Sequence, residues 1–514
     1  MPEGRTLFPV PDLSWPGEGT GAYERIEVEV MEDKVRALFK KISFDRNNVK
    51  TDSRKIKPGD VFVAIRGTAR DGHDYVREAF EKGALISLCE HEVPVLPGEC
   101  RGKVVIVEDT RIVLGDIARE VFDDPSSALS VYGVTGTNGK TTTVFLIDAI
   151  LSGAGRPSGL VSTVFTRTRG ETLDRSSMTT PGLMKLNRFL SEMISDGKRA
   201  AVVEISSHAL DQKRICGIGL DSAVFTNISP EHLDYHKDMK TYLKDKSLIF
   251  NNLKKNGTGV LNLDDPMVRG LMDTVDFPDL VTFGLGKDAD VRAENIRLSE
   301  GGTELDILAG KLGSANVSTR LIGRHNVYNM LAAAAALLNS GLDIENIKEA
   351  LETFSPVPGR LDAVVSRAPF SVFVDYAHTP NALENVLQCM RPLTSGKLIC
   401  VFGCGGDRDW TKRPVMGRIA CELCDRVILT SDNPRTEEPE EILRQIEKGV
   451  LNKNNYSIMK KRSDAIQGSL KTAEKGDIVI IAGKGHEDYQ IMGDKVLHFD
   501  DKEVAGEMLR GMGY

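Results

Sequence analysis

The stretch SVYGVTGTNGKTTTVFLIDAIL, residues 130–151, decides the fold of this chain. An apolar segment predicts a buried strand, residues 136–139 predict a glycine-rich turn, and the residues that follow predict a helix that begins near Lys140. In such a turn the backbone N–H groups can approach phosphate oxygens, and the helix N-terminus adds partial positive charge. The stretch therefore predicts a nucleotide-binding loop at the edge of an α/β sheet.

Two side chains of this loop can act on a bound phosphate. Lys140 can reach the β- and γ-phosphates, and the hydroxyl of Thr141 can ligate Mg²⁺. The loop reads GxxGxxGKTT, because Val134 stands where the strict phosphate-loop pattern has glycine. A plain glycine-rich turn between strand and helix is the alternative. The loop alone does not distinguish a ligase from a GTPase switch or a transport ATPase.

Apolar segments alternate with helical patterns on both sides of the loop, and most apolar segments run into polar or charged residues. Near-continuous apolar strands that alternate with helices predict parallel sheets covered on both faces, with ligands bound at the carboxyl ends of the strands. Strands are expected at 59–65, 103–108, 200–207, 222–229 and 257–265, and in FSVFVDYAHTP, GKLICVFGCGGDRD, CDRVILTSDNPR and GDIVIIAGKGHED. Helices are expected at 73–83, 110–122 and 326–341.

Two proline-containing segments, 125–127 and 355–360, divide the chain. Residues 1–28 are predicted to be an extension of unknown role. We predict an α/β fold of three domains. They are a small α/β N-terminal domain (29–127), a central P-loop ATPase-type parallel sheet (128–356) and a C-terminal Rossmann-like parallel sheet (357–514). The segment SPVPGR at 355–360 is a candidate hinge between the last two.

Composition excludes several classes of protein. The 514 residues include 66 Lys and Arg and 74 Asp and Glu, so the net charge is 66 − 74 = −8. This balance predicts no broad basic surface of the kind that binds nucleic acid. The sequence predicts neither a membrane span nor a secretory signal, and we expect a cytoplasmic monomer with small-molecule partners. Eight cysteines are too few for a disulfide scaffold. A zinc site at Cys400, Cys404, Cys421 and Cys424 is the weaker alternative to buried thiols.

Glu204 and His232 follow the next two predicted strands and could complete a metal site near the phosphate loop. Surface or hydrogen-bonded residues at strand ends are the alternative for each. Placing a phosphoryl group beside a carboxylate brings two anions together, so metal ions and Lys140 would offset their repulsion.

Eleven motifs occur in an order that resembles the Mur ligase family, and within it the members that add meso-2,6-diaminopimelate to a UDP-muramoyl-dipeptide. The resemblance covers nearly the whole chain from about residue 30. The motifs are TDSR at 51, GTNGKTTT at 136, TTP at 179, EISSHAL at 204, TNISPEHLDYH at 226, GRHNVYN at 323, PGRLD at 358, DYAHTPNALE at 375, GCGGDRD at 403, DNPR at 432 and GKGHED at 483.

The resemblance implies an ATP site and a UDP-muramoyl-dipeptide site. For single residues the alternatives are turn formation, helix capping and, for Arg360 with Asp375, a surface ion pair. The implied ATP-binding residues are Gly136, Thr137, Asn138, Gly139, Lys140, Thr141, Thr142, Asn326, Asn329, Arg360 and Asp375. The implied UDP-muramoyl-dipeptide residues are Ser53, Thr68, Ala69, Arg70, Asp71, Thr179, Thr180, Ser206, Gln212 and Arg214.

Lys246 matches the lysine that is carbamylated in the family. A carbamate is an oxygen anion that can help to hold a second Mg²⁺, which an ammonium cannot do. The implied catalytic residues are therefore Lys140, Glu204, His232 and Lys246, and the implied metal ligands are Thr141, Glu204, His232 and carbamylated Lys246. On composition alone, Lys246 would be a solvated lysine on an amphipathic helix.

The motif DNPR is typical of the members that add diaminopimelate. There Arg435 is implied to bind the carboxylate at the far end of the amino acid, which lysine lacks. A salt bridge within the loop is the alternative for Arg435. The implied diaminopimelate residues are Arg408, Asp432, Asn433, Pro434, Arg435, Gly483 and Glu487.

The implied activity is ATP-dependent formation of an amide bond, through an acyl phosphate on the γ-carboxylate of D-Glu. The rival interpretations are a ligase that adds lysine, a folylpolyglutamate-type synthetase and a nucleotide-binding protein without turnover. DNPR disfavours the first, and the N-terminal block, which is similar to a UDP-sugar-binding domain, disfavours the second. The presence of Lys140, Glu204, His232 and Lys246 disfavours the third.

Overall fold

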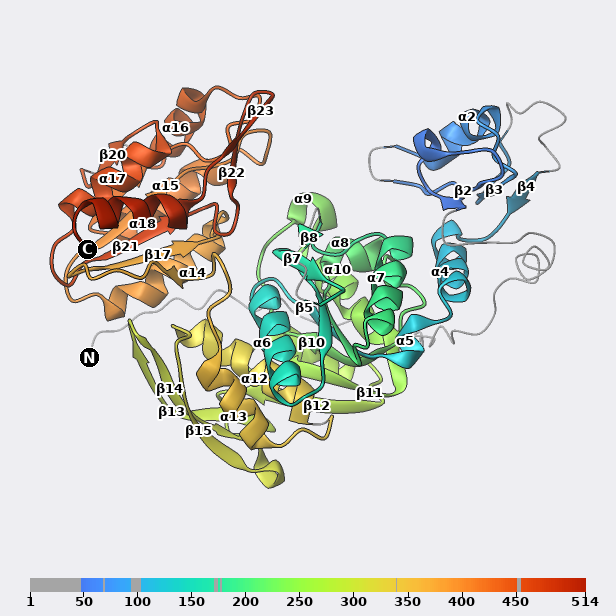
Figure 1. Cartoon of the computed structure of the whole chain (residues 1–514), viewed down its shortest axis with the longest axis horizontal. Coiled ribbons are helices and arrows are strands. Elements are labelled where there is room, and N and C mark those ends of the chain that lie inside the picture. Colours follow the sequence, from blue (N-terminus) through green and yellow to red (C-terminus); the bar gives the residue numbers. More distant parts are fainter. Residues whose placement is uncertain are drawn as a thin grey trace, which may run out of the picture.

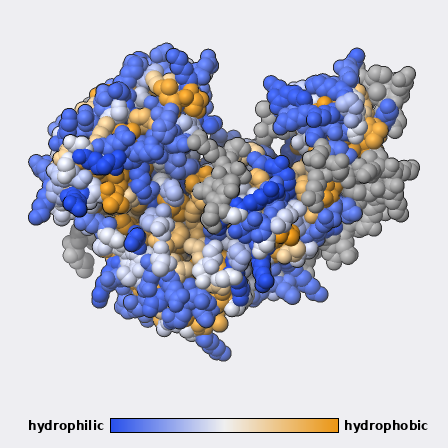
Figure 2. All heavy atoms as spheres, in the orientation of Figure 1, coloured by the Kyte–Doolittle hydropathy of each residue, from blue (hydrophilic) through white to orange (hydrophobic). Residues whose placement is uncertain are grey.

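The computed structural model describes residues 48–67, 70–93, 103–170, 174–175, 178–338, 340–450 and 454–514. Within these ranges the chain forms three separate α/β units, one around each main sheet (Figure 1). The predicted extension at 1–28 and the implied site residues Thr68 and Ala69 lie outside the described residues. Most of the face seen in Figure 2 is hydrophilic, with apolar residues in scattered patches. No described helix is long and apolar enough to cross a membrane.

The N-terminal unit is a four-stranded parallel sheet in the order β1-β2-β3-β4. Both apolar segments predicted here form strands, and both predicted helical segments are helical. Its elements are β1 Val49–Lys50, η1 Ser53–Lys55, β2 Val61–Val63, η2 Gly72–Tyr75, α2 Val76–Glu81, β3 Ile86–Cys89, β4 Val104–Ile106, α4 Thr110–Val121 and α5 Pro125–Ala128.

The central unit is one sheet of eleven strands, in the order β15-β14-β13-β12-β11-β10-β5-β9-β6-β7-β8. Strands β6 to β13 in this order are parallel, whereas β7, β8, β14 and β15 are antiparallel to their neighbours. The strands are β5 Ser130–Thr135, β6 Ser158–Val161, β7 Phe165–Arg167, β8 Asp174–Arg175, β9 Ala200–Glu204, β10 Leu220–Phe225, β11 Leu253–Asn262, β12 Asp279–Gly284, β13 Val291–Ser299, β14 Gly302–Leu308 and β15 Ser314–Thr319.

This sheet corrects the expectation of a purely parallel central sheet. In β13 to β15, buried residues alternate with exposed or half-buried ones, so one face of this meander is open to water. Antiparallel strands tolerate such one-sided burial, whereas parallel strands are normally covered on both faces. The continuous apolar runs thus predicted the parallel part, and the alternating segments formed the antiparallel edge.

Helices cover both faces of the parallel strands. One apolar core joins the sheet to α6, α12 and α13, and a second core on the opposite face joins it to α7, α8 and α10. The predicted helices at Lys140 and at 326–341 are α6 and α12. The helices are α6 Lys140–Gly153, α7 Leu183–Ser195, α8 Ser207–Asp211, α9 Leu233–His236, α10 Met239–Ser247, η3 Leu248–Asn252, α11 Pro266–Arg269, η4 Gly270–Asp273, η5 Gly310–Leu312, α12 Arg324–Leu338 and α13 Ile344–Thr353.

The C-terminal unit has a six-stranded sheet in the order β16-β17-β21-β18-β19-β20, parallel except for β16, and a separate hairpin β22-β23. The four predicted strands are β17, β18, β19 and β21. The elements are β16 Asp362–Ala363, β17 Ser371–Asp375, α14 Pro380–Met390, η6 Arg391–Leu393, β18 Leu398–Phe402, α15 Lys412–Leu423, β19 Arg426–Leu429, α16 Pro439–Glu447, β20 Tyr456–Ile458, α17 Arg462–Thr472, β21 Ile478–Ala482, β22 Tyr489–Met492, β23 Lys495–His498 and α18 Asp501–Gly511.

Helices α14, α15 and α16 cover one face of this sheet, and α17 and α18 cover the other. Cys400, Cys404, Cys421 and Cys424 are buried in the first of these cores. Among the described residues, the cluster with metal-ligand geometry is Asp71, His73 and His91 rather than these thiols. The interpretation of the four cysteines as buried structural thiols agrees with this packing.

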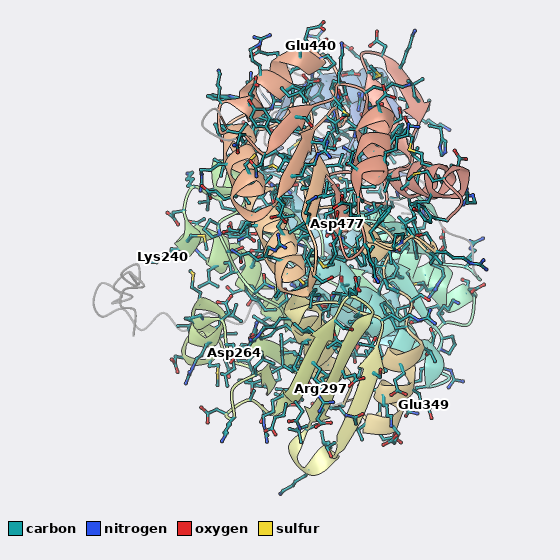
Figure 3. All side chains as sticks on the ribbon, turned by 90° about the vertical axis from the view of Figure 1, so that its left-hand side faces the viewer. Lys240, Asp264, Arg297, Glu349, Glu440 and Asp477 are labelled. Atoms are coloured by element: carbon teal, nitrogen blue, oxygen red, sulfur yellow. The ribbon has the colours of Figure 1, made fainter. Side chains whose placement is uncertain are left out.

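Arg297 on β13 and Glu440 on α16 are exposed charged side chains, whereas Asp477, near the middle of the view in Figure 3, is buried. The buried carboxylate of Asp477 accepts the backbone N–H groups of Lys397 at 2.7 Å and Glu474 at 2.9 Å. It therefore fixes the turns that lead into β18 and β21.

The ion pair of Arg462 and Asp501 joins α17 to α18 with both side chains fully buried, at 2.7 and 2.6 Å. We expect Arg462→Met to destabilise the C-terminal unit by about 3–5 kcal/mol, because Asp501 would keep an uncompensated buried charge. Thermal and denaturant unfolding of the full chain would measure the change. Arg418→Met, which breaks the exposed pair with Glu422, is the control and should change stability by less than about 0.5 kcal/mol. Equal losses in the two variants would contradict the prediction.

Candidate functional site

The phosphate loop connects β5 to α6 and has a backbone shape that requires glycine. Gly136 has φ 142° and Gly139 has φ 83°. A Cβ atom would lie 1.9 Å from Thr226 Oγ1 at Gly136, and 2.2 Å from Asn329 Oδ1 at Gly139. Any larger residue at either position would therefore displace the loop or its neighbours.

Asn227, which follows β10, holds the loop in place. Its carbonyl accepts the N–H of Thr137 at 2.8 Å, and its side-chain oxygen accepts the N–H of Asn138 at 2.9 Å. The Asn227 amide also donates to the Asn138 carbonyl at 3.0 Å. Asn138 in turn donates to Asn381 of the C-terminal unit at 3.0 Å. Asn227 lies in the motif TNISPEH, but the spacing of the motifs does not predict its contact with the phosphate loop.

Lys140 and Lys246 converge on one carbonyl oxygen. Lys140 Nζ donates to the Gly136 carbonyl at 3.0 Å and to the Thr137 carbonyl at 2.8 Å. Lys246 Nζ, on α10, donates to the same Gly136 oxygen at 2.7 Å. The interpretation of Lys246 as a solvated lysine is wrong, because its side chain is buried and lies 4.6 Å from the centre of the Tyr242 ring.

Burial, and then the charge of Lys140, hold the pKa of the Lys246 ammonium well below its usual range. Both causes favour the neutral amine, which is the form that can react with an electrophile. Lys246 is thus a buried amine beside the phosphate loop.

Glu204 lies at the end of β9 and is buried. Its Oε1 accepts the hydroxyl of Thr141 at 3.1 Å, and its Oε2 accepts the N–H of Thr163 at 2.9 Å. The Thr141 hydroxyl also accepts a hydrogen bond from Arg360 Nη2 at 3.3 Å, so the last residue of the predicted hinge touches the phosphate loop. Thr142, in the same turn, is buried. Thr141 and Glu204 together offer the hard oxygen atoms that Mg²⁺ prefers.

His232 has a left-handed backbone, with φ 55°, and its ring lies 4.9 Å from that of His208. Burial lowers the pKa of His232, with further effects from Lys140 and Lys246 that Glu231 opposes. Burial and the neighbouring His232 and His236 lower the pKa of His208 to about 4. Both rings are therefore neutral near pH 7, as a metal-ligating imidazole must be.

Asn326 and Asn329 lie inside α12, so they do not cap it. Asn329 Nδ2 donates to Asn326 Oδ1 at 2.9 Å, and Asn326 Nδ2 donates to the Ile322 carbonyl at 2.8 Å. The Asn329 side-chain oxygen faces Gly139 of the phosphate loop and accepts the Thr143 hydroxyl at 3.5 Å. This pair of buried amides therefore borders the phosphate loop.

Asp375, at the end of β17, does not pair with Arg360 by a short ion pair. Its carboxylate accepts the N–H of Leu361 at 2.7 Å and the N–H of Ala377 at 2.8 Å. The guanidinium of Arg360 lies over the ring of Tyr376, 4.8 Å from its centre. Asp375 thus holds the strained turn at Leu361, which has φ 44°, and that turn directs Arg360 toward Thr141.

Five residues implied in peptide binding lie close together in the central unit. The Thr180 hydroxyl donates to the Glu204 carbonyl at 2.8 Å and accepts the Ser206 N–H at 3.0 Å. Arg214 donates to the Thr180 carbonyl at 3.1 Å and to Gln212 Oε1 at 2.6 Å, and the Thr179 hydroxyl accepts that of Thr163 at 3.2 Å. Ser206 also caps α8, so its capping interpretation is correct as well.

Arg111, on α4, connects this group to the N-terminal unit and was missed from the sequence. It donates to the Gln212 carbonyl at 2.7 Å and to the Arg66 carbonyl at 2.5 Å. Arg66 lies next to Gly67, the last described residue before the gap at 68–69, and Arg70 beyond that gap is exposed. A guanidinium that bonds two backbone oxygens from different units has no recognisable local pattern.

In the N-terminal unit, Ser53 donates to Glu78 at 3.2 Å. Asp71 accepts His73 Nδ1 at 2.5 Å, while His73 Nε2 accepts the N–H of Glu90 at 2.9 Å. Since Nε2 accepts a hydrogen bond, the ring proton is on Nδ1, and neither nitrogen is free to ligate a metal. The Asp71, His73 and His91 cluster is therefore a structural contact.

The DNPR and GKGHED loops meet at the carboxyl edge of the C-terminal sheet. Asn433 Nδ2 donates to Glu487 Oε2 at 2.8 Å, and a Cβ at Gly483 would lie 2.6 Å from Asp432 Oδ2. Arg435 Nη1 donates to the Gly406 carbonyl at 2.7 Å, and Gly493 donates to the Arg435 carbonyl at 2.7 Å. Arg435 therefore has no carboxylate partner in its own loop, which is against the salt-bridge alternative.

The GCGGDRD loop completes this region. Arg408 is exposed on it. Arg413 is fully buried, binds Glu437 at 2.7 Å and donates to the Gly405 carbonyl at 3.0 Å. The role of Arg413 was not predicted, because its helix, α15, has the sequence pattern of an ordinary amphipathic surface helix.

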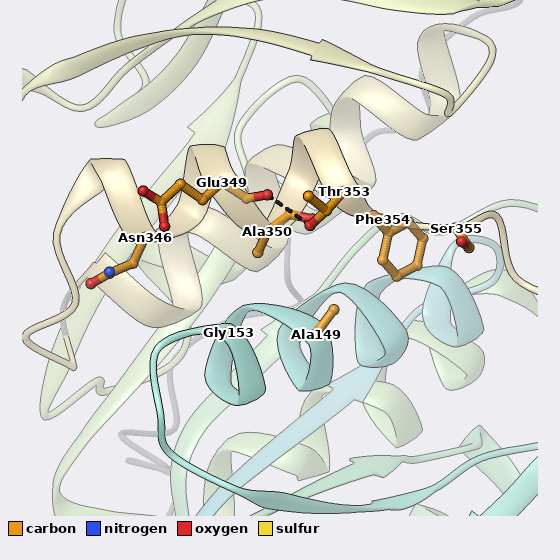
Figure 4. A pocket seen from close by; sticks show the side chains of 8 residues that line it. All are labelled: Ala149, Gly153, Asn346, Glu349, Ala350, Thr353, Phe354 and Ser355. Carbon is orange, nitrogen blue, oxygen red and sulfur yellow. Dashed lines mark hydrogen bonds between the residues drawn. The ribbon is translucent and has the colours of Figure 1, made fainter.

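A pocket between α6 and α13 lies apart from these loops (Figure 4). It opens beside Ala149 and Gly153, at the C-terminal end of α6, whereas the phosphate loop is at the N-terminal end. At 1.5 Å per residue, Lys140 and Gly153 are about 20 Å apart along the helix. The pocket is therefore not part of the candidate site.

Three segments match described protein families. Residues 46–121 match "Mur ligase family, catalytic domain", residues 134–337 match "Mur ligase middle domain", and residues 359–485 match "Mur ligase, glutamate ligase domain". Together they span most of the chain.

Two similar proteins and one similar solved structure are named as diaminopimelate ligases. A Clostridium acetobutylicum protein, UDP-N-acetylmuramoyl-L-alanyl-D-glutamate--2,6-diaminopimelate ligase 1, is 41% identical over 471 residues, 91% of this chain and 96% of that protein. The ligase of that name from Bacillus licheniformis is 43% identical over 467 residues, 90% and 94% of the two chains. A solved structure of a ligase with the same name superposes with a TM-score of 0.66, at 31% identity, over 91% of this chain and 95% of that one.

The glycine requirement of the loop can be tested by Gly139→Ala. We expect nucleotide binding to weaken at least about 10-fold, because a Cβ at φ 83° would displace Asn329 and the loop. Titration with a fluorescent ATP analogue would measure the dissociation constant. Gly155→Ala is the matched control, since Gly155 also has positive φ, at 70°, but nothing lies within 4 Å of its Cβ position. Unchanged binding by Gly139→Ala would show that the contact is not needed.

Proposed function

The chain belongs to the Mur ligase family, and from that premise we propose that it catalyses the ATP-dependent addition of meso-2,6-diaminopimelate to UDP-N-acetylmuramoyl-L-alanyl-D-glutamate. The bond formed is an amide between the γ-carboxyl group of D-Glu and an amine of diaminopimelate. The product is a precursor of peptidoglycan, so the enzyme serves cell-wall synthesis.

The observation that carries this assignment is the presence of one cationic and one anionic side chain, Arg435 and Glu487, where the DNPR and GKGHED loops meet. Diaminopimelate presents, at its far end, both a carboxylate and an ammonium group. Arg435 can bind the carboxylate, and Glu487, which is held by Asn433, can bind the ammonium. Lysine has the ammonium without the carboxylate, so it would leave the guanidinium without its partner. The lysine-adding interpretation is therefore the less favoured one.

The reaction proceeds in two steps. An oxygen of the D-Glu γ-carboxylate attacks the γ-phosphorus of ATP, and ADP leaves with the electrons of the broken P–O bond. The neutral amine of diaminopimelate then attacks the acyl carbon, phosphate leaves with the electrons of the C–O bond, and the nitrogen loses a proton. Lys140, Arg360 and the loop N–H groups would stabilise the charge that builds up on the phosphoryl oxygens.

We propose Mg²⁺ as the cofactor, held by Thr141, Glu204 and His232. The residues present fit such an ion, because Thr141 and Glu204 are in contact and the His232 ring is neutral. When bound, Mg²⁺ would supply positive charge that offsets the repulsion between the phosphoryl group and the attacking carboxylate.

Lys246 as a free cation does not fit a second metal ion, and we propose that it is carbamylated. Its neutral nitrogen would attack the carbon of CO₂, form an N–C bond and lose one proton, which leaves a carboxylate on Nζ. The lowered pKa of the buried amine favours this reaction. The new anion would also replace one of the two lysine charges that meet at the Gly136 carbonyl.

The muramoyl-peptide is proposed to lie along Thr179, Thr180, Ser206, Gln212 and Arg214, with its nucleotide end near Ser53 and residues 68–71. Asn326, Asn329 and Asp375 would border the adenosine and phosphates of ATP, and Arg408, Asp432, Pro434 and Gly483 would line the amino-acid site. Since the ATP and amino-acid sites are on different units, a movement at 355–360 would bring them together. We further propose a cytoplasmic monomer that acts on small molecules.

The function can be tested by the dependence of ATP consumption on both acceptors. We expect ADP release only when the UDP-muramoyl-dipeptide and diaminopimelate are both present, and kcat/KM for diaminopimelate about 10⁴ times that for lysine. ADP release without the dipeptide, or equal use of the two amino acids, would contradict the proposal.

Arg435→Asn tests the origin of this preference. Asparagine tolerates the left-handed backbone of this position, at φ 54°, while the guanidinium is removed. We expect kcat/KM for diaminopimelate to fall about 100-fold or more and that for lysine to stay within about threefold. Arg418→Asn, on the exposed face of α15, is the control. An equal fall for both amino acids would indicate a structural role instead.

Lys246→Arg tests the carbamate, because arginine is a long basic side chain that cannot be carbamylated. We expect kcat to fall about 100-fold or more. In wild type, ¹³C-labelled bicarbonate should give a carbamate carbon signal that the variant lacks. Lys244→Arg is the matched control, since Lys244 is exposed on the same helix two positions away. Full activity of Lys246→Arg, without the labelled signal in wild type, would rule out the carbamate.

A further inference from the structure

Lys484 is a fully buried lysine in the turn after β21 and is not one of the proposed substrate-binding residues. Its Nζ donates to the Tyr489 carbonyl at the start of β22 and lies 3.5 Å from Asn433 Oδ1. It also lies 3.6 Å from Glu487 Oε2. The side chain therefore reaches the DNPR loop, the hairpin and the proposed ammonium-binding carboxylate at once.

Burial of an ammonium group is costly unless opposite charge compensates for it. The two neutral oxygens that Lys484 contacts offer only partial compensation. Glu487 supplies the negative charge, and among the described residues Lys484 is the cation within 4 Å of its carboxylate. The position of Lys484 is thus explained by Glu487 as well as by the hairpin.

The carboxylate of Glu487 needs such a cation. Burial and the charge of Asp432 raise the pKa of Glu487, and Lys484 opposes this rise, followed by Asn433 and Arg435. A buried carboxylate that lies near a second one tends to hold a proton unless a positive charge lies close to it. A protonated Glu487 could not pair with an ammonium ion.

The other ionisable groups that face Glu487 do not replace Lys484. Arg462 is bound by both nitrogens to Asp501, and Arg435 donates to the Gly406 carbonyl. Tyr376 and Tyr489 are neutral near pH 7, since burial raises the pKa of each. His486 is neutral as well, because burial and Arg360 lower its pKa to about 4.

We propose that Lys484 is a positioning residue that keeps Glu487 ionised, so that Glu487 can bind the far ammonium group of the amino-acid substrate. Lys484 itself does not touch the substrate, since its side chain is fully buried behind Glu487 and Asn433. The inference rests on the proposed function of this site.

A purely structural role for Lys484 predicts a different result. If Lys484 only held β22 through the Tyr489 carbonyl, its loss would disturb the site equally at every pH. If it holds Glu487 in the ionised form, its loss raises the pKa of that carboxyl group. Binding is then weakened at low pH and recovers as the pH rises and Glu487 ionises again.

The test compares Lys484→Gln, which can still donate to the Tyr489 carbonyl, with Lys484→Arg, which keeps the charge. For Lys484→Gln we expect KM for diaminopimelate to be about 10-fold above wild type at about pH 6.5 and within about threefold at about pH 8.5. KM for ATP should stay within about twofold of wild type at both values. Lys484→Arg should restore most of the binding at low pH.

Two further variants separate charge from structure. Glu487→Gln should raise KM for diaminopimelate at all pH values, and the double variant with Lys484→Gln should resemble Glu487→Gln alone. Gln490→Ala removes the hydrogen bond of the hairpin to the Asp432 carbonyl, at 2.7 Å, without a change of charge. Any effect of Gln490→Ala should therefore be independent of pH.

A rise in KM that is the same at both pH values in Lys484→Gln would overturn the inference, as would additive effects in the double variant. Thermal unfolding would establish that Lys484→Gln folds, and if it does not, a ¹³C-labelled glutamate titration of wild type and Lys484→Arg would be used. A Glu487 that titrates above pH 7 in wild type would then refute the proposal. If wild type itself shows no dependence on diaminopimelate, the proposed function fails instead.

Discussion

Two lysine side chains, one from α6 and one from α10, donate to the same carbonyl oxygen, that of Gly136. This contact is possible only because β10, β5 and β9 are adjacent and parallel, so that their carboxyl ends meet at one edge. The phosphate loop follows β5, Glu204 ends β9 and Asn227 follows β10, so the same strand pairing brings all three together. Burial and the neighbouring charge of Lys140 lower the pKa of Lys246, so this point of the structure favours a neutral amine.

The sequence predicts the parts of the fold that are governed by local pattern. Strands β5, β9, β10 and β11, and the four parallel strands of the C-terminal unit, were predicted because their apolar runs are buried on both faces. The meander β13 to β15 was not, because its half-exposed pattern carries a weaker signal. The contacts of Asn227, Arg111 and Arg413 were missed, since they depend on backbone oxygens and N–H groups brought together from distant segments.

The three units interact through both apolar and polar contacts: Leu183 of α7 is buried in the core of the N-terminal unit, and Ile322 is buried in that of the C-terminal unit. Arg111 reaches from the N-terminal unit to the Gln212 carbonyl, and Arg360 and Asn381 reach from the C-terminal unit to Thr141 and Asn138. Polar contacts of this kind can be exchanged for others at little cost, whereas a common apolar core would resist separation. Any movement of the units relative to one another must therefore keep or re-form the apolar contacts of Leu183 and Ile322, as well as exchange the polar ones.

The left-handed backbone at Arg435 has a consequence for how such a protein can evolve. The backbone at Arg435, with φ 54°, is strained for most residues that have a Cβ atom. Glycine, and to a lesser degree asparagine, adopt this conformation at lower cost. Random mutation under selection for folding alone would therefore drift away from arginine. Arg435 would therefore be retained only under continuous selection for recognition of the substrate. A lineage that came to use a different amino acid could replace Arg435 by glycine or asparagine and so gain stability.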